Sequence, residues 1–143
     1  MKAVIQRVLS ASLSVDGRTV SEIGKGLVVY LGVGKGDTAD DCAYFANKIA
    51  NMRIFDDGAG KMNLSALSEG YGVLLVSQFT LYGDAAHGNR PSFSGAELPD
   101  AANALYELTA EKLRALGLTV KQGIFGADMK IVQLCDGPVT IIL

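Results

Sequence analysis

The polar segment Ser77-Gln78-Phe79-Thr80 directly follows an apolar run, residues 73–76, that is typical of a buried strand. Hydroxyl and amide side chains at a strand end can bind a polar ligand through uncharged hydrogen bonds. The neighbouring backbone N–H groups can stabilise an oxyanion. By composition alone, Thr80 is also an ordinary strand residue and Ser77 an ordinary strand-end residue. The pattern is therefore compatible with a site that binds a polar ligand or stabilises an oxyanion, and with a plain strand end.

A second informative step is Gly137-Pro138, which precedes the apolar C-terminal run 139–143. An X-Pro bond adopts the cis form at modest cost, and glycine relieves the restriction that proline places on the preceding residue. A cis bond here would turn two carbonyl oxygens in one direction, whereas a trans bond would make an ordinary turn. Together with Ser77–Thr80, this step suggests a pocket with one polar wall and one rigid backbone wall.

Arg7 is anomalous in a strand pattern. It shares the parity of the apolar residues around it, so an unbroken strand would turn it to the apolar side: Ile5, Leu9, Ala11, Leu13 and Val15. A buried guanidinium must be paired or hydrogen-bonded. Either Arg7 fixes a carbonyl-rich element, or a bulge changes the parity and leaves Arg7 exposed.

Other groups capable of catalysis are few. His87 is the only histidine, and no Ser-His-Asp triad can be read from the sequence. His87, Cys42 and Cys135 lack the spacing of metal ligands, and no glycine-rich nucleotide motif is present. We therefore expect no metal and no cofactor. Cys135, beside the Gly-Pro step, leaves a thiol-dependent hydrolase as an alternative.

The bulk properties indicate one domain, residues 1–143. The chain is 49% hydrophobic and 20% charged, which is typical of a globular protein. Its net charge of −2 provides no broad basic field for nucleic acid. No apolar run approaches the roughly 18 residues needed to cross a bilayer, and two cysteines are too few for a disulfide framework. The sequence thus predicts a soluble, cytoplasmic protein without membrane contact.

Strands and helices do not alternate regularly. Strands are predicted at 9–15, 18–23, 27–33, 72–81, 118–121, 129–135 and 139–143. One helix opens at Asp37-Thr38, and its inner face is expected to hold Cys42, Phe45, Ile49 and Met52. Another runs from Pro99 to Gly117, with an inner face of Ala102, Leu105, Thr109, Leu113 and Leu116. This order favours an α+β fold, a curled, barrel-like mixed sheet with two main helices.

Ser77-Gln78-Phe79-Thr80-Leu81 together with Gly137-Pro138-Val139-Thr140 resembles the paired signature of the D-aminoacyl-tRNA deacylases. Further matches run nearly end to end: residues 3–8, 26–33, 48–49, 53–55, 60–63, 90–93 and 125–129. Two departures are visible. Cys135 stands where the family usually has Asn, and His87 stands where it usually has Lys.

The resemblance implies a cytoplasmic homodimer that hydrolyses the ester between a D-amino acid, or glycine, and the 3′-terminal adenosine of tRNA. It implies that Gly137-Pro138 is cis and reaches into the partner subunit's pocket, where it blocks L side chains. Arg7 would support that element. The two opening segments would then meet across the dimer interface, with active sites between subunits.

Two mechanisms remain open. Thr80 could be the nucleophile, or the backbone N–H groups around Phe79 and Thr80 could form an oxyanion hole while the ribose 2′-hydroxyl assists water. The absence of a legible base favours the second. The competing class is a non-catalytic RNA-binding module that recognises tRNA ends.

Overall fold

A six-stranded mixed sheet forms the centre of the protein, whose computed structural model describes residues 1–143. Its strands are β1 (Lys2–Val15), β2 (Arg18–Ile23), β3 (Gly26–Gly32), β6 (Gly72–Ser77), β7 (Val120–Gln122) and β8 (Met129–Ile142). The remaining elements are α1 (Ala39–Asn51), β4 (Phe55–Asp56), β5 (Met62–Leu64), α2 (Ala66–Glu69), the 3-10 turn η1 (Phe79–Tyr82) and α3 (Pro99–Ala115).

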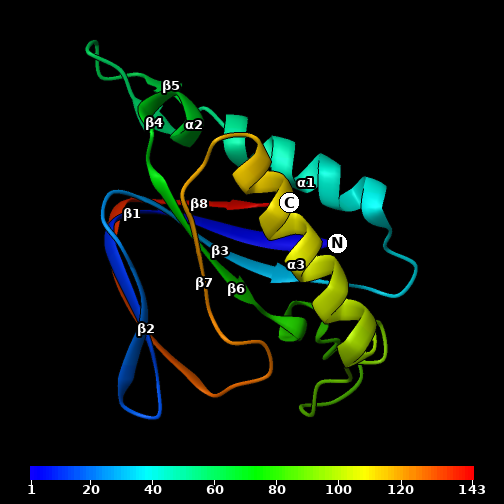
Figure 1. Ribbon diagram of the computed structural model, residues 1–143. Helices are drawn as coiled ribbons and strands as arrows, with labels where there is room; N and C mark the ends of the chain where they lie inside the picture. Colours follow the sequence, from blue (N-terminus) through cyan, green and yellow to red (C-terminus); the bar gives the residue numbers. More distant parts are fainter.

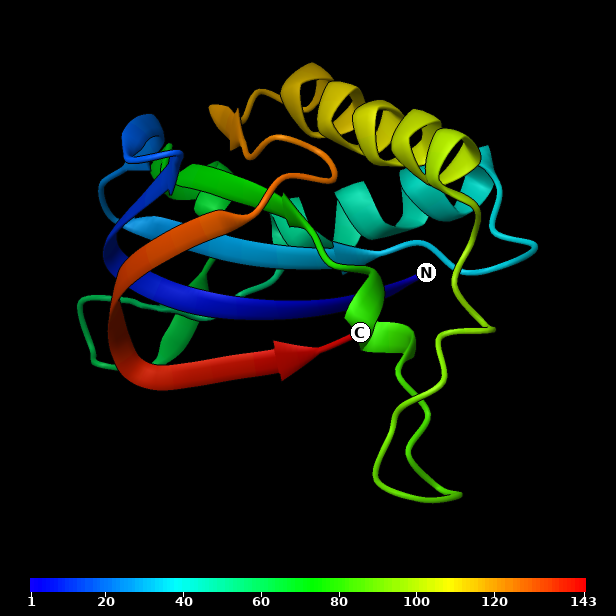
Figure 2. The same cartoon turned by 90° about the horizontal axis from the view of Figure 1, so that it is seen from below.

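The sheet has both parallel and antiparallel pairs. β1 pairs antiparallel with β2, β3 and β8, whereas β6 pairs parallel with β3 and β7. β2 also contacts β6 and β7, so the sheet curls until it nearly closes into a barrel (Figures 1 and 2). The predicted α+β fold with a curled mixed sheet and two main helices, α1 and α3, is confirmed.

β3 and β6 are buried on both faces. On one face, Leu27, Leu75 and their neighbours pack under α1 and α3 in a core of 19 buried residues. On the other face, Val28 and Leu74 pack against the second half of β1 and against β2 in a smaller cluster of seven. Figure 1 shows the two helices on one side of β3 and β6 and the curled strands β1, β2 and β8 on the other. The sheet therefore needs its own curl to cover its second face.

β1 serves both cores by changing face. Ala3 and Ile5 belong to the helix-side core, whereas Val8, Ala11 and Leu13 belong to the other. The β1–β8 register shifts twice at this point, between Gln6 and Val8 and between Val8 and Ser10. Because the strand turns over there, Leu9 is exposed despite its parity. The first of these shifts spans Arg7 itself, so the strand is irregular there, and the Arg7 side chain is nevertheless buried.

Several predicted boundaries are wrong. The strand expected at 72–81 ends at Ser77, because its partner β3 ends at Gly32 and the chain then folds into η1. The strands expected at 129–135 and 139–143 form one strand, β8, since β1 pairs with both halves. β1 begins at Lys2 rather than at Leu9. The β4–β5 hairpin and α2, capped by Ser65, were not anticipated.

Most residues predicted for the inner helix faces are buried, but Met52, just past the end of α1, and Leu105 of α3 are only partly buried. Cys42, Phe45 and Ile49 are buried on α1 as expected. On α3, Leu116 is 40% exposed, because the helix ends at Ala115, and the largest buried side chain is instead Tyr106. The Tyr106 hydroxyl donates to the Leu75 carbonyl at 2.8 Å. Burial, the largest cause, raises the pKa of Tyr106 to about 12.

We predict that Tyr106→Phe reduces the loss of stability at alkaline pH. The folded protein holds the Tyr106 proton more tightly than the unfolded chain, whose pKa is near 10. Its contribution to the free energy of unfolding is therefore complete below pH 10 and is lost as pH rises through about 12. Urea unfolding between pH 9 and 12 should show a shallower decline for Tyr106→Phe. The exposed Tyr44 provides the control: Tyr44→Phe should keep the wild-type slope, and equal slopes for all three proteins would contradict the prediction.

Candidate functional site

A cavity of about 270 Å³ opens where β6 ends. Ser77, Gln78 and Phe79 form one wall, and the segment from Phe125 to Met129 forms another. Tyr106 and Ala102 of α3 also line the cavity. Ten of its 14 lining residues are hydrophobic, so the polar atoms of the β6 end face a mostly apolar space that suits an organic ligand. Three of the four predicted residues of the polar wall thus line one cavity.

The backbone at the end of β6 is fixed by the neighbouring strand. The Gln78 N–H donates to the Leu31 carbonyl at 2.8 Å, which continues the β3–β6 pairing by one residue. The first hydrogen bond of η1 runs from the Leu81 N–H to the Gln78 carbonyl at 3.4 Å. The N–H groups of Phe79 and Thr80 therefore precede the hydrogen bonding of the turn and are available to an acceptor.

Thr80 is not a lining residue of the cavity. Its side chain is exposed, and its Oγ1 accepts a hydrogen bond from Gln78 Nε2. An amide nitrogen cannot take up a proton as a general base can. The immediate surroundings of the Thr80 hydroxyl thus offer an orienting partner and no activating base.

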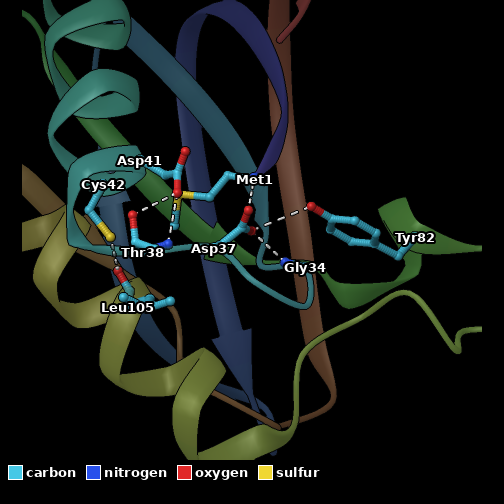
Figure 3. Close-up of polar contacts among 8 residues, drawn as sticks. All are labelled: Met1, Gly34, Asp37, Thr38, Asp41, Cys42, Tyr82 and Leu105. Carbon is cyan, nitrogen blue, oxygen red and sulfur yellow. Dashed lines mark hydrogen bonds and ion pairs between the residues drawn. The ribbon is translucent and has the colours of Figure 1, made fainter.

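Asp37 joins η1 to the loop after β3 (Figure 3). Its Oδ2 accepts from the Gly34 N–H at 2.6 Å and from the Tyr82 hydroxyl at 3.5 Å, and its Oδ1 lies 2.5 Å from the Met1 amino group. Burial and then the Asp37 charge raise the pKa of Tyr82 to about 12, so the phenol stays a donor. Asp37 was anticipated only as part of a helix start, and the contact with Tyr82 has no signal in sequence spacing.

The start of α1 follows the same loop. Asp41 accepts from the Thr38 backbone N–H at 2.7 Å in a reciprocal capping arrangement. That hydrogen bond holds the pKa of Asp41 below its ordinary value. The cap fixes the start of α1 directly after Asp37.

Arg7 is buried, with 6% of its surface exposed, and every contact is to an oxygen. Nη1 donates to the Ile54 carbonyl at 2.7 Å and lies 3.5 Å from Oδ2 of Asp56. Nε lies 3.1 Å from Oδ2 of Asp136 and donates to the Asp136 carbonyl at 3.3 Å. The inward orientation of Arg7 matches the alternative in which this side chain is buried and fixes a carbonyl group. Arg7 contacts Asp136, the residue directly before Gly137-Pro138.

The Gly137-Pro138 bond is cis, and both residues are exposed on β8. This step lies opposite Arg7, which pairs with Leu27, whereas Ser77 pairs with Leu31. Four residues of strand correspond to about 13 Å. Figure 2 shows the bend of β8 and the green η1 turn at opposite ends of the sheet. Within one chain, the two segments are therefore not neighbouring walls of one pocket.

The other candidate groups lie apart. Cys135 is exposed and its sulfur accepts from Gln133 Nε2 at 3.3 Å, whereas Cys42 is buried under α3. His87 is exposed in the loop after η1. No three His, Cys, Asp or Glu side chains are grouped so that they could hold a metal ion. No helix is long and apolar enough to cross a membrane.

Known proteins resemble this chain along its whole length. The family model described as D-Tyr-tRNA(Tyr) deacylase matches residues 4–143. A D-aminoacyl-tRNA deacylase of Myxococcus xanthus (strain DK1622) is 58% identical over 143 residues, covering 100% of this chain and 94% of that protein. One from Fervidobacterium nodosum (strain ATCC 35602 / DSM 5306 / Rt17-B1) is 54% identical over 143 residues, covering 100% and 96%.

Solved structures show the same fold. A c-Myc DNA unwinding element binding protein is 41% identical, with a TM-score of 0.93 over 100% of this chain and 97% of its own. A probable eukaryotic D-amino acid tRNA deacylase is 18% identical, with a TM-score of 0.82 over 99% and 97%, and supports the fold alone. The chain therefore belongs to the D-Tyr-tRNA(Tyr) deacylase family and is an enzyme of that family, a hydrolase of aminoacyl-tRNA esters.

Proposed function

We propose that this enzyme removes D-amino acids, and glycine, from tRNA and rejects L-aminoacyl-tRNA through Gly137-Pro138. The observation that carries the proposal is the cavity at the end of β6, where an apolar space meets Ser77, Gln78 and the N–H groups beside Phe79. A terminal adenosine and its ester require such a combination, because the base and ribose are buried while the ester oxygen needs donors.

In this proposal, backbone N–H groups, rather than the Thr80 side chain, promote catalysis. Attack of water on the ester carbonyl places negative charge on oxygen, and the N–H groups of Phe79 and Thr80 are free to stabilise it. The ribose 2′-hydroxyl of the substrate assists the water, and the 3′-hydroxyl of the adenosine leaves with a proton. Gln78, which binds Thr80 Oγ1, orients that side chain.

A second copy of the chain supplies the missing wall. β8 pairs with β1 along one edge only, and it exposes Val132, Leu134 and Ile142 to 71%, 58% and 77%. β8 carries three of the eleven exposed large apolar side chains, more than any other element, and this favours a protein interface there. Pro138 lies on the same strand, so a homodimer formed there brings Gly137-Pro138 of one subunit toward the cavity of the other.

Chiral selection then works by exclusion. The carbonyls at Gly137-Pro138, held through Arg7 and Asp136, occupy the space that an L side chain needs, while a D side chain points away. Glycine has no side chain to exclude. A protein that binds only the aminoacyl end of tRNA needs few phosphate contacts, in keeping with a net charge of −2. Because its substrate belongs to translation, we place the enzyme in the cytoplasm.

The proposal predicts deacylation of D-aminoacyl-tRNA at least about 100-fold faster than of the matched L form, since a blocked side chain cannot reach the reactive geometry. Release of labelled amino acid from both enantiomers on one tRNA measures this ratio. Cys135→Ser is the control and should keep wild-type rates. Equal rates on both enantiomers would contradict the proposed rejection of L-aminoacyl-tRNA. Loss of activity in Cys135→Ser would restore the thiol mechanism, and binding of tRNA without hydrolysis would indicate an RNA-binding module.

Thr80→Ala should retain kcat within about tenfold of wild type, because the backbone N–H at position 80 survives the substitution. Single-turnover deacylation with saturating enzyme separates the chemical step from binding. A loss of about 10⁴-fold or more with unchanged substrate affinity would instead make Thr80 the nucleophile.

Leu134→Asp should convert the dimer to a monomer and lower the D-to-L rate ratio by at least about tenfold, since a carboxylate at a buried apolar contact is unpaired. Sedimentation velocity gives the mass, and the enantiomer assay gives the ratio. Tyr44→Asp, at a position on α1 that is 56% exposed, is the matched control. A Leu134→Asp protein that stays dimeric, or a monomer with the wild-type ratio, contradicts the proposed interface.

A further inference from the structure

We propose that Tyr82 and Asp37 are positioning residues: they anchor η1 and thereby hold the Phe79 and Thr80 N–H groups at the cavity. The inference rests on the proposed function, since it concerns the geometry of the proposed oxyanion donors. It assigns a role to two residues that do not line the cavity.

η1 needs an anchor because little else holds its far end. The turn contains four residues, and Phe79 and Thr80 at its start are exposed. β6 fixes the chain up to Gln78 through the hydrogen bond to Leu31. Beyond that point, the hydrogen bond from the Leu81 N–H to the Gln78 carbonyl is long, at 3.4 Å. A 3-10 segment of this length is marginal in isolation. Edge-to-face contact of Phe79 with Phe93, at 5.1 Å between ring centroids, steadies the outer side.

Tyr82 provides the anchor through its ring. The ring lies against the backbone at the end of β3, at Gly32, and just beyond it, at Gly34. A Cβ on Gly34 would overlap the Tyr82 hydroxyl and ring, and a Cβ on Gly32 would lie 3.3 Å from Tyr82 Cδ2. The absence of side chains at these positions creates the flat seat that the ring occupies.

Polar contacts support the ring in this seat (Figure 3). The Tyr82 hydroxyl donates to Asp37 Oδ2 at 3.5 Å, and the same oxygen accepts from the Gly34 N–H at 2.6 Å. The carboxylate therefore ties the ring and its seat to one atom. Lys2 Nζ lies 4.7 Å from the ring centroid and donates to the Leu81 carbonyl at 3.3 Å.

Displacement of Tyr82 must move the start of the turn because the segment is so short. The Gly83 N–H donates to the Thr80 carbonyl at 2.9 Å, and the Leu81 N–H donates to the Gln78 carbonyl. The first bond joins the residue after Tyr82 to Thr80, and the second joins the residue before Tyr82 to the peptide unit that carries the Phe79 N–H. Tyr82 belongs to neither hydrophobic core, so its loss should disturb this segment and leave the rest of the fold intact.

The test compares Tyr82→Ala, Gly34→Ala and the conservative Tyr82→Phe. Gly34 has no positive φ, so alanine fits its backbone and blocks only the seat of the ring. We expect Tyr82→Ala and Gly34→Ala to lower kcat on D-aminoacyl-tRNA by about 10- to 100-fold and to change KM by less than about threefold. Misplaced N–H donors stabilise the transition state less well but leave the binding of the substrate almost unchanged. Tyr82→Phe should stay within about fivefold of wild type. Tyr44→Ala is the control and should equal wild type.

Amide hydrogen exchange gives a readout that does not depend on catalysis. In Tyr82→Ala and Gly34→Ala, exchange at Leu81 and Gly83 should accelerate by at least about tenfold, while the amides of β3 and β6 stay protected. The inference is overturned if the wild type is active and both variants keep its kcat, or if both keep its exchange rates. Global unfolding of Tyr82→Ala also overturns it. A wild type that does not deacylate D-aminoacyl-tRNA overturns the proposed function instead, and the exchange data still decide whether Tyr82 anchors η1.

Discussion

Burial of β3 and β6 on both faces is the constraint on which the rest of the structure depends. A strand pair with apolar side chains on both faces must be covered twice. α1 and α3 cover one face, and the chain has no further long helix for the other. The curled half of β1, with β2 and β8, covers that second face. Polar groups are thereby confined to the ends of these strands, and the cavity forms at one such end.

The change of face in β1 links this constraint to Arg7. The strand turns over between Ile5 and Ala11, because its two halves belong to different cores. Arg7 lies at the turn, and its guanidinium is buried among the Asp136, Asp56 and Ile54 oxygens. A buried cation without partners would cost several kcal/mol. The requirement that Arg7 be paired therefore fixes the chain before Gly137-Pro138 to the middle of the sheet.

The sequence predicted what local chemistry determines. Apolar runs predicted the strands and helical spacing predicted the buried stripe of α1, whereas parity left an inward Arg7 as one of two alternatives. The same reasoning failed where long-range pairing decides. Nothing local shows that β1 bridges residues 129–135 and 139–142 into one strand. The 3-10 turn at Phe79 also has no local signal, since Phe-Thr-Leu-Tyr has high strand propensity and ends the strand only because β3 stops at Gly32. The cavity wall from Phe125 to Met129 lies about 50 residues from Ser77 and meets it only in the folded sheet.

The proposed site, built from backbone groups, would have a particular sensitivity to substitution. Side chains can change where they do not shape the backbone, and the two departures from the family pattern are of this kind. Cys135 points outward, bound to Gln133, and His87 lies in an exposed loop. Neither contacts Arg7 or Asp37. Under the proposed function, the positions that must be kept are those that hold main-chain atoms in place: a guanidinium beside Asp136, a carboxylate beside Gly34, and a ring seated on bare backbone. In such an enzyme, precision resides in residues that need never touch the substrate.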